Sequence, residues 1–252
     1  MYLFLANKMF GTLHIICLLS CAVVITLLTI FLRKISIEKS IRITLICGII
    51  SEIIKVGTYI IINEEEYGGY LPKTDLPFHL CSIQIIFLLI LTFTKKESIK
   101  RLLLSFMIPS CLIGGLGALM IPTSSSLNRY VITFQYYMYH AVIMWFALHL
   151  LLSKEFKLTL KDYRNSLLFL LAVGMLAIYV NSLLNDYIHN INFMYVVNPP
   201  AENLPILNKN HGWLVYILSY GGIAVVAITM FYIRPFIEFF KSKSKKQQET
   251  SN

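Results

Sequence analysis

Seven long apolar segments constrain this chain more than any other feature of its sequence. They cover residues 12–32, 42–62, 77–94, 101–121, 134–152, 166–184 and 213–233. A helix rises about 1.5 Å per residue, so about 20 apolar residues cross the hydrocarbon layer of a bilayer. Only 14% of the residues are charged, too few to cover a water-exposed surface. The sequence therefore predicts an all-α, polytopic membrane helix bundle with seven transmembrane helices.

The basic residues predict how these helices are oriented. Seventeen of the 22 lysines and arginines fall on one side of the predicted topology, in loops 33–42, 95–101 and 153–165 and in the C-terminal tail. The residues on the other side are Lys8, Lys73, Arg129 and Lys209. Because basic loops stay in the cytoplasm, we expect the N-terminus outside and the C-terminus in the cytoplasm. Anionic lipid headgroups beside these loops explain the net charge of +9, so no nucleic-acid partner is expected.

The loops between the segments are too short to hold a second domain. We therefore expect one membrane domain over residues 1–235, followed by a basic, disordered tail over residues 236–252. Two loops on the predicted outer side stand out, the acidic loop Glu64–Glu66 and the long connection 185–212. The long connection is either an ordinary surface loop or, because of its apolar run Phe193–Val197, a lid that folds back onto the membrane.

Ionisable and amide side chains within the apolar segments are costly in a bilayer, so each is a candidate functional residue. They are Glu52, Lys55, His79, Cys81, Gln84, His140 and Asn181. Counted at 1.5 Å per residue from the outer ends of their segments, Cys81 and His140 have similar depths, roughly 6 Å and 9 Å. The sequence therefore predicts a thiol and an imidazole at one level on two different helices.

A thiol beside an imidazole is a good nucleophile, because the imidazole takes the thiol proton and its positive charge then balances the thiolate. His79 is two residues from Cys81 and lies on another helical face, so His140 is the better candidate base. Gln84 follows Cys81 by three residues and shares its face. The alternative interpretation is structural: a buried free cysteine usually behaves as a small hydrophobe, and a histidine can simply join two helices.

Glu52 and Lys55 have i, i+3 spacing and are expected to neutralise each other or to support the site. A second hypothesis, a small-solute or ion transporter, would use Glu52, Lys55 and the histidines as a polar path. A third is a non-catalytic membrane sensor or assembly partner. The five cysteines form no CxxC pair and no cluster with histidines at zinc spacing, so neither a metal nor a cofactor is expected.

The segment Leu76-Pro77-Phe78-His79-Leu80-Cys81 resembles the LPxHxC signature of the YwaF-type bacterial integral membrane proteins, a family of conserved hypothetical proteins. Other parts look similar too: the run from Gly117 to Pro122, the histidine His140, and Asn192-Phe193-Met194-Tyr195 followed by prolines. Asn198 departs from the pattern, which has a basic residue before the prolines. The resemblance extends over about residues 10 to 235.

This bacterial family is distantly similar to a eukaryotic transmembrane phospholipid acyltransferase that depends on a cysteine. The resemblance implies that Cys81 is the nucleophile and His140 the base of an enzyme that transfers or removes acyl groups of membrane lipids in the outer leaflet. In that case Gln84 or Asn181 would stabilise the oxyanion, and His79 would orient the lipid headgroup. The implied location is the bacterial plasma membrane, and the implied partners are its lipids. The sequence does not indicate an oligomeric state.

Overall fold

The computed structural model describes residues 10–62, 71–121, 130–200, 204, 206–207, 209–210 and 212–249, and the secondary structure within these ranges is entirely helical. The long helices are α1 (Thr12–Phe31), α2 (Ile37–Gly57), α4 (Leu80–Phe93), α5 (Glu97–Met120), α6 (Tyr130–Leu152), α7 (Leu160–Leu184), α8 (Trp213–Phe231) and α9 (Ile233–Glu249). The short elements are the π-helix η2 (Thr58–Ile62), which continues α2, and the 3₁₀ helices η3 (Lys73–Asp75) and η5 (Phe193–Tyr195).

Six helices in the described part of the chain are long and apolar enough to cross a membrane: α1, α2, α5, α6, α7 and α8. They coincide with six of the seven predicted segments, which confirms a multi-pass helix bundle. Helix α4 is shorter than predicted. It has 14 residues and a length of about 21 Å, less than the roughly 30 Å of the hydrocarbon layer. The count of seven spans and the orientation of the termini stay predictions.

The start of α4 explains its length. The prediction began the helix at residue 77, but it begins at Leu80. Leu76, the residue before Pro77, is extended with φ −56° and ψ 151°, as expected for a residue whose helical conformation would clash with the proline ring. His79 is extended as well and is the N-cap. Cys81 is therefore the second residue of its helix and lies in the first turn.

Two other helices begin earlier than their apolar segments because polar residues cap them. The Ser36 hydroxyl accepts a hydrogen bond from the Lys39 N–H, so α2 begins at residue 37 rather than 42. Thr159 and Asp162 form a capping box, so α7 begins at residue 160 rather than 166. Hydropathy finds the apolar part of a helix, whereas capping determines its first turn.

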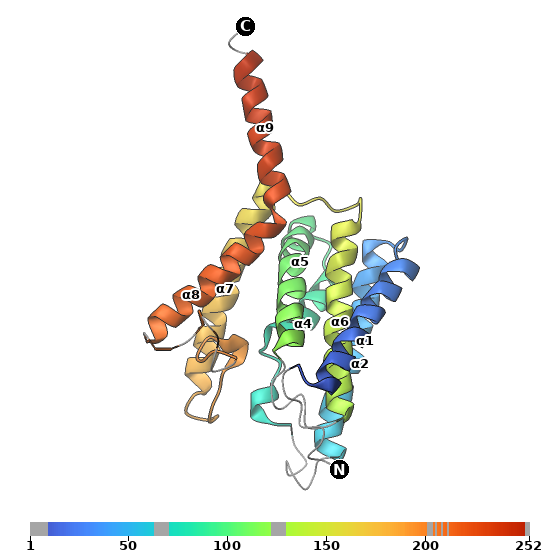
Figure 1. Ribbon diagram of the computed structural model, residues 1–252, viewed down its shortest axis with the longest axis vertical. Helices are drawn as coiled ribbons and strands as arrows, with labels where there is room; N and C mark the ends of the chain where they lie inside the picture. Colours follow the sequence, from blue (N-terminus) through green and yellow to red (C-terminus); the bar gives the residue numbers. More distant parts are fainter. Residues whose placement is uncertain are drawn as a thin grey trace.

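Helix α6 lies at the centre of the bundle and packs against α1, α2 and α5. Its side chains Trp145, Phe146 and Leu150 are completely buried. Figure 1 shows α7 and α8 side by side on the other side of α5, away from α1, α2 and α6. The outer helices α1, α7 and α8 expose many large apolar side chains, such as Leu19 and Leu218, as a lipid-facing surface requires.

Two glycines allow the close packing around α6. A Cβ atom at Gly48 of α2 would lie 3.0 Å from Ile85 Cγ1 on α4 and 3.4 Å from Tyr139 Cε2 on α6. At Gly115 of α5 a Cβ atom would lie 2.5 Å from Met144 Cγ and 3.7 Å from the His140 carbonyl oxygen, both on α6. Small residues of this kind let membrane helices approach each other closely. The two glycines thus bring α2 and α5 against the part of α6 that carries Tyr139 and His140.

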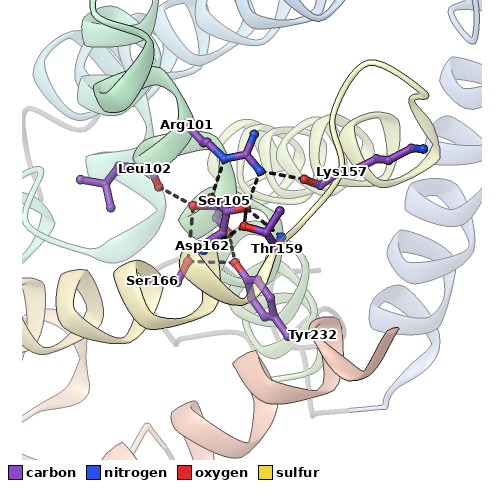
Figure 2. Close-up of polar contacts among 8 residues, drawn as sticks. All are labelled: Arg101, Leu102, Ser105, Lys157, Thr159, Asp162, Ser166 and Tyr232. Atoms are coloured by element: carbon purple, nitrogen blue, oxygen red, sulfur yellow. Dashed lines mark hydrogen bonds and ion pairs between the residues drawn. The ribbon is translucent and has the colours of Figure 1, made fainter. Parts of the chain in front are cut away.

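An ion pair joins α5 to α7. Arg101 of α5 donates from Nε to Asp162 Oδ1 at 2.7 Å and from Nη2 to Asp162 Oδ2 at 2.6 Å, a bidentate geometry (Figure 2). The Asp162 carboxylate is 2% exposed and also accepts from the N–H and the hydroxyl of Thr159. A third Arg101 hydrogen bond, also from Nη2, reaches the Lys157 carbonyl oxygen at 2.9 Å. The polar atoms of this buried carboxylate are therefore well satisfied.

The end of α8 joins the same group of side chains. The Tyr232 hydroxyl lies 3.0 Å from Ser166 Oγ on α7 and donates to the Ser105 carbonyl oxygen on α5 at 3.3 Å (Figure 2). We call the set Arg101, Ser105, Thr159, Asp162, Ser166 and Tyr232 the clasp. Helices α4 and α5 are antiparallel neighbours joined at residues 94–96, so the clasp and the start of α4 are at opposite ends of the bundle.

The C-terminal tail differs from its prediction. Residues 236–252 were expected to be disordered, but helix α9 extends from Ile233 to Glu249 and projects beyond the bundle (Figure 1). Helix α9 follows α8 with only Tyr232 between them. The predicted acidic loop Glu64–Glu66, Lys8, Arg129 and Pro122 lie outside the described residues.

Candidate functional site

The Cys81 thiol lies at the N-terminus of α4, where the backbone N–H groups of a first helical turn have no carbonyl partner within the helix. The positive end of a helix dipole favours a thiolate within this first turn. Cys81 is half-buried, whereas Cys21 and Cys111 are completely enclosed. Among the cysteines, Cys81 thus has the surroundings that suit a nucleophile.

His140 is buried in the middle of the bundle, with 2% of its surface exposed. Its Nδ1 lies 2.7 Å from the Tyr136 carbonyl oxygen, one turn earlier in α6. Because a carbonyl oxygen only accepts, Nδ1 carries the proton in this contact. In the neutral ring the other nitrogen, Nε2, then has a free lone pair. This is the tautomer that a general base requires.

Tyr139 connects Cys81 with His140. It donates its hydroxyl proton to the Cys81 carbonyl oxygen at 2.7 Å, and its ring centroid lies 5.9 Å from that of His140. The Tyr136 ring lies 4.3 Å from the His140 ring. One side chain of α6, Tyr139, therefore contacts both the backbone of Cys81 on α4 and the His140 imidazole.

Glu52 and Lys55 form the expected ion pair within α2. Lys55 Nζ lies 2.8 Å from Glu52 Oε2, and the two side chains are 27% (Glu52) and 14% (Lys55) exposed. Lys55 also donates to the Asp75 carbonyl oxygen at 3.4 Å, which ties α2 to the segment that leads into α4. Both charges interact electrostatically with the Cys81 thiol, with opposite effects. The pair therefore supports the start of α4 and offers no unpaired charge.

The segment after α7 folds back onto the helices; whether it covers the membrane surface as a lid stays a prediction. Asn181 of α7 holds its backbone: Oδ1 accepts from the Phe193 N–H at 2.8 Å and Nδ2 donates to the Phe193 carbonyl oxygen at 3.0 Å. Phe193 and Met194 are buried. We call residues 192–198 the lid segment. Asn192 closes this segment, since its Oδ1 accepts from the N–H groups of Val197 and Asn198.

His79 connects the lid segment to α4. Its Nδ1 accepts from the Met194 N–H at 3.4 Å, and its ring lies 5.4 Å from Phe193 and 5.7 Å from Tyr195. Met194 and Tyr195 both have left-handed backbone conformations, with φ of 54° and 55°. Each such residue costs on the order of 1 kcal/mol or more and persists only where its surroundings enforce it. The lid segment therefore holds strained backbone directly beside the Cys81 helix.

The two predicted oxyanion donors are engaged elsewhere. Asn181 uses its Nδ2 protons on the Ala177 and Phe193 carbonyl oxygens. Gln84 donates from Nε2 to Ser110 Oγ at 3.0 Å, and its Oε1 is a buried acceptor without a partner among the described residues. The Ser110 hydroxyl gives its own proton to the Phe106 carbonyl oxygen, which fixes this orientation of the Gln84 amide. Both amide side chains are therefore already engaged by groups within the bundle.

Sequence reasoning missed the tyrosines at this site, which are Tyr136, Tyr139 and Tyr195. Tyr136 is four residues before His140 and so shares its helical face, which was a usable signal. The chain has 15 tyrosines, however, and many fit an interfacial aromatic belt. Tyr195 is far from His79 in sequence, and only the folding of the lid segment brings their rings to 5.7 Å. Within the described residues, no three histidine, cysteine or carboxylate side chains form a metal-binding cluster.

Comparison with known proteins supplies a family for this bundle. No curated protein matches the chain, and no solved structure does. Residues 9–232 match the family model of the TMEM164 family, a family of transmembrane proteins. The matched range contains α1 to α8 and every residue of the site above. The resemblance to YwaF-type proteins and to an acyltransferase stays a prediction. Because the match covers most of the 252 residues, the chain belongs to the TMEM164 family.

Proposed function

We propose that the protein is an enzyme that transfers or removes acyl groups of membrane lipids, with Cys81 as nucleophile and His140 as base. The observation that carries this proposal is the contact of Tyr139 with both residues: its hydroxyl bonds to the Cys81 carbonyl oxygen and its ring packs against the His140 ring. His140 also has the tautomer in which Nε2 accepts a proton. The resemblance of the LPxHxC segment supports the same assignment. On the predicted topology, the site opens in the outer leaflet of the cell membrane.

The chemistry follows from these two groups. Cys81 gives its proton to His140 Nε2, and the sulfur attacks the carbonyl carbon of a lipid ester. The carbonyl π electrons move to oxygen and form a tetrahedral oxyanion. When the oxyanion collapses, the C–O bond to glycerol breaks, and the leaving alkoxide takes the proton from His140. The products are a Cys81 thioester and a lysolipid. Water or an acceptor hydroxyl then releases the acyl group by the same steps in reverse.

The transporter hypothesis receives no specific support from the site. It requires Glu52 and Lys55 to line a polar path, but these two side chains pair with each other at 2.8 Å and lie beside the start of α4. A paired charge of this kind stabilises a structure more readily than it carries an ion.

The proposal is tested with the full-length protein in vesicles of phosphatidylethanolamine and phosphatidylglycerol. Mass spectrometry measures lysolipid release and an acyl adduct on the Cys81 peptide that neutral hydroxylamine removes. The wild type should show both, and Cys81→Ala should show neither. Cys47→Ala is the matched control, because Cys47 is another half-buried membrane cysteine and lies on α2 rather than α4, and it should behave as wild type. Lysolipid release at the wild-type rate in Cys81→Ala would rule out the mechanism.

A further inference from the structure

Helix α9 has an apolar face that is exposed in the structure. Ile233, Ile237 and Phe240 follow one another at spacings of four and three residues, so they lie on one side of the helix. Phe239 is next to Phe240, and their ring centroids are 5.6 Å apart. The four side chains are 48% to 63% exposed. A contiguous apolar face outside the core of a protein marks an interaction surface.

Basic side chains border this face. The sequence from Ile233 to Glu249 contains five lysines and arginines but only two glutamates. Arg234 pairs with Glu238 at 2.8 Å, so these two charges cancel. Lys241 and Lys243 are exposed, and no ion pair joins either of them to a carboxylate that the structure describes. Their positive charge is therefore available to an external anion.

The positions of the two lysines suit a surface that is anionic outside and apolar inside. Lys241 follows Ile237 by four residues and Lys243 follows Phe240 by three, so each lysine lies at an edge of the apolar face. From there a lysine stem lies along hydrocarbon while its ammonium group reaches the level of the headgroups. An apolar face bordered by lysines is typical of helices that lie in a membrane interface.

The start of α9 is fixed at the end of a membrane-spanning helix. Only Tyr232 separates α9 from α8, and its backbone, with φ −105° and ψ 7°, interrupts the helix, so α8 and α9 need not share a direction. The Phe236 ring packs against Tyr163 of α7 at 5.2 Å. Every side chain from Ile237 to Ser244 is exposed, and α9 projects beyond the bundle (Figure 1). Because α8 ends where the chain leaves the bilayer, the surface nearest to the apolar face of α9 is the membrane itself.

We propose that α9 docks on the membrane surface beside the bundle and binds anionic phospholipids. Its apolar face enters the boundary of the acyl chains, and Lys241 and Lys243 contact the headgroups. On the predicted topology this is the cytoplasmic leaflet, at the end of the bundle that contains the clasp. A 17-residue helix is only marginally stable by itself in water, so docking also keeps α9 helical.

The test uses the full-length protein in nanodiscs of phosphatidylcholine, with or without phosphatidylglycerol, that hold one or two copies of the chain. Mass spectrometry measures hydrogen exchange of the α9 amides after Phe236. Exchange should be about 10-fold slower or more in the anionic discs, because each basic side chain near an anionic surface strengthens binding about five-fold. Salt at about 1 M, where the Debye length is about 3 Å, should remove most of this difference.

Two double variants separate the charges of α9 from those of the bundle. Lys241→Gln with Lys243→Gln should make α9 exchange about 10-fold faster in the anionic discs. Lys95→Gln with Lys96→Gln is the matched control, because it removes two exposed lysines at the same end of the bundle, before α5. This control should exchange as the wild type does. Cys81→Ala should do so as well, since the docking does not involve the thiol.

Slow exchange that requires phosphatidylglycerol, Lys241 and Lys243 in discs with one copy supports the proposal. Equal exchange of α9 in the two kinds of disc overturns it. Equal acceleration in the two double variants overturns it as well, because the total charge of the protein would then matter rather than α9. If α9 is protected only in discs with two copies, its apolar face joins a second copy of the chain, and the proposal of lipid docking is wrong.

Discussion

The two ends of the helix bundle both bury polar side chains, but the hydrogen bonding and the backbone conformation differ between them. In the clasp, Asp162 accepts hydrogen bonds from Arg101 and Thr159, and Tyr232 joins α5 to α7. At the start of α4, strained backbone at Tyr195 packs against His79, two residues before a half-buried thiol. The clasp satisfies its buried carboxylate, whereas the start of α4 combines strained backbone with a reactive side chain.

The difference suggests a role for each region: the clasp stabilises the fold, and the start of α4 carries the function. A buried charge that has all its partners rigidifies the helices around it, and loss of one partner leaves the other uncompensated. Strained backbone stabilises nothing by itself, so it persists in a fold where it is useful. The comparison therefore predicts that substitutions in the clasp change the free energy of unfolding, while substitutions around Cys81 change activity.

The largest effect is expected from His140→Gln. Loss of the general base should slow acylation of Cys81 by about 100-fold or more, while the free energy of unfolding changes by less than about 1 kcal/mol. Acylation is followed by mass spectrometry and unfolding by denaturant titration in detergent. His149→Gln is the matched control, because His149 is another buried histidine of α6, packed against Trp145 rather than the Cys81 tyrosines. Acylation within two-fold of wild type would remove His140 from the mechanism.

The next largest effect is expected from Asp162→Ala. It leaves Arg101 without its bidentate partner and breaks the α7 capping box, so unfolding should become easier by about 3 kcal/mol. Glu97→Ala breaks an ion pair with Lys100 in which Glu97 is 84% exposed, and should cost less than about 1 kcal/mol. In Asp162→Ala protein that remains folded, iodoacetamide should alkylate Cys81 at the wild-type rate. Equal free energies of unfolding for Asp162→Ala and Glu97→Ala would contradict the claim that the clasp stabilises the fold.

A smaller and local effect is expected from Asn181→Ala. The lid segment loses both hydrogen bonds to Phe193, a destabilisation of about 1–3 kcal/mol. Hydrogen exchange of the backbone amides in residues 192–198 should therefore become at least several times faster, with α5 and α6 unchanged. Ser182→Ala, an exposed neighbour on α7, should leave exchange as it is. If exchange accelerated evenly through the bundle, Asn181 would be part of the global core instead.

Particular residues show how far the sequence could be interpreted. The apolar segments located six membrane helices, because a bilayer demands about 20 apolar residues wherever a helix crosses it. Glu52 and Lys55 could be paired from their spacing alone, because i and i+3 side chains are neighbours on a helix. Asn181 could not be interpreted correctly, because its partner Phe193 lies in an irregular segment whose path has no sequence periodicity.

The sequence by itself determined that this chain spans a membrane many times and that a thiol and an imidazole lie on separate helices. Hydropathy and helical rise are properties of single segments, so they can be read without the fold. Tertiary structure decided that α4 begins only at Leu80, that Tyr139 joins Cys81 to His140, and that Tyr195 packs against His79. These features depend on packing between segments far apart in the chain, and no local pattern encodes such contacts.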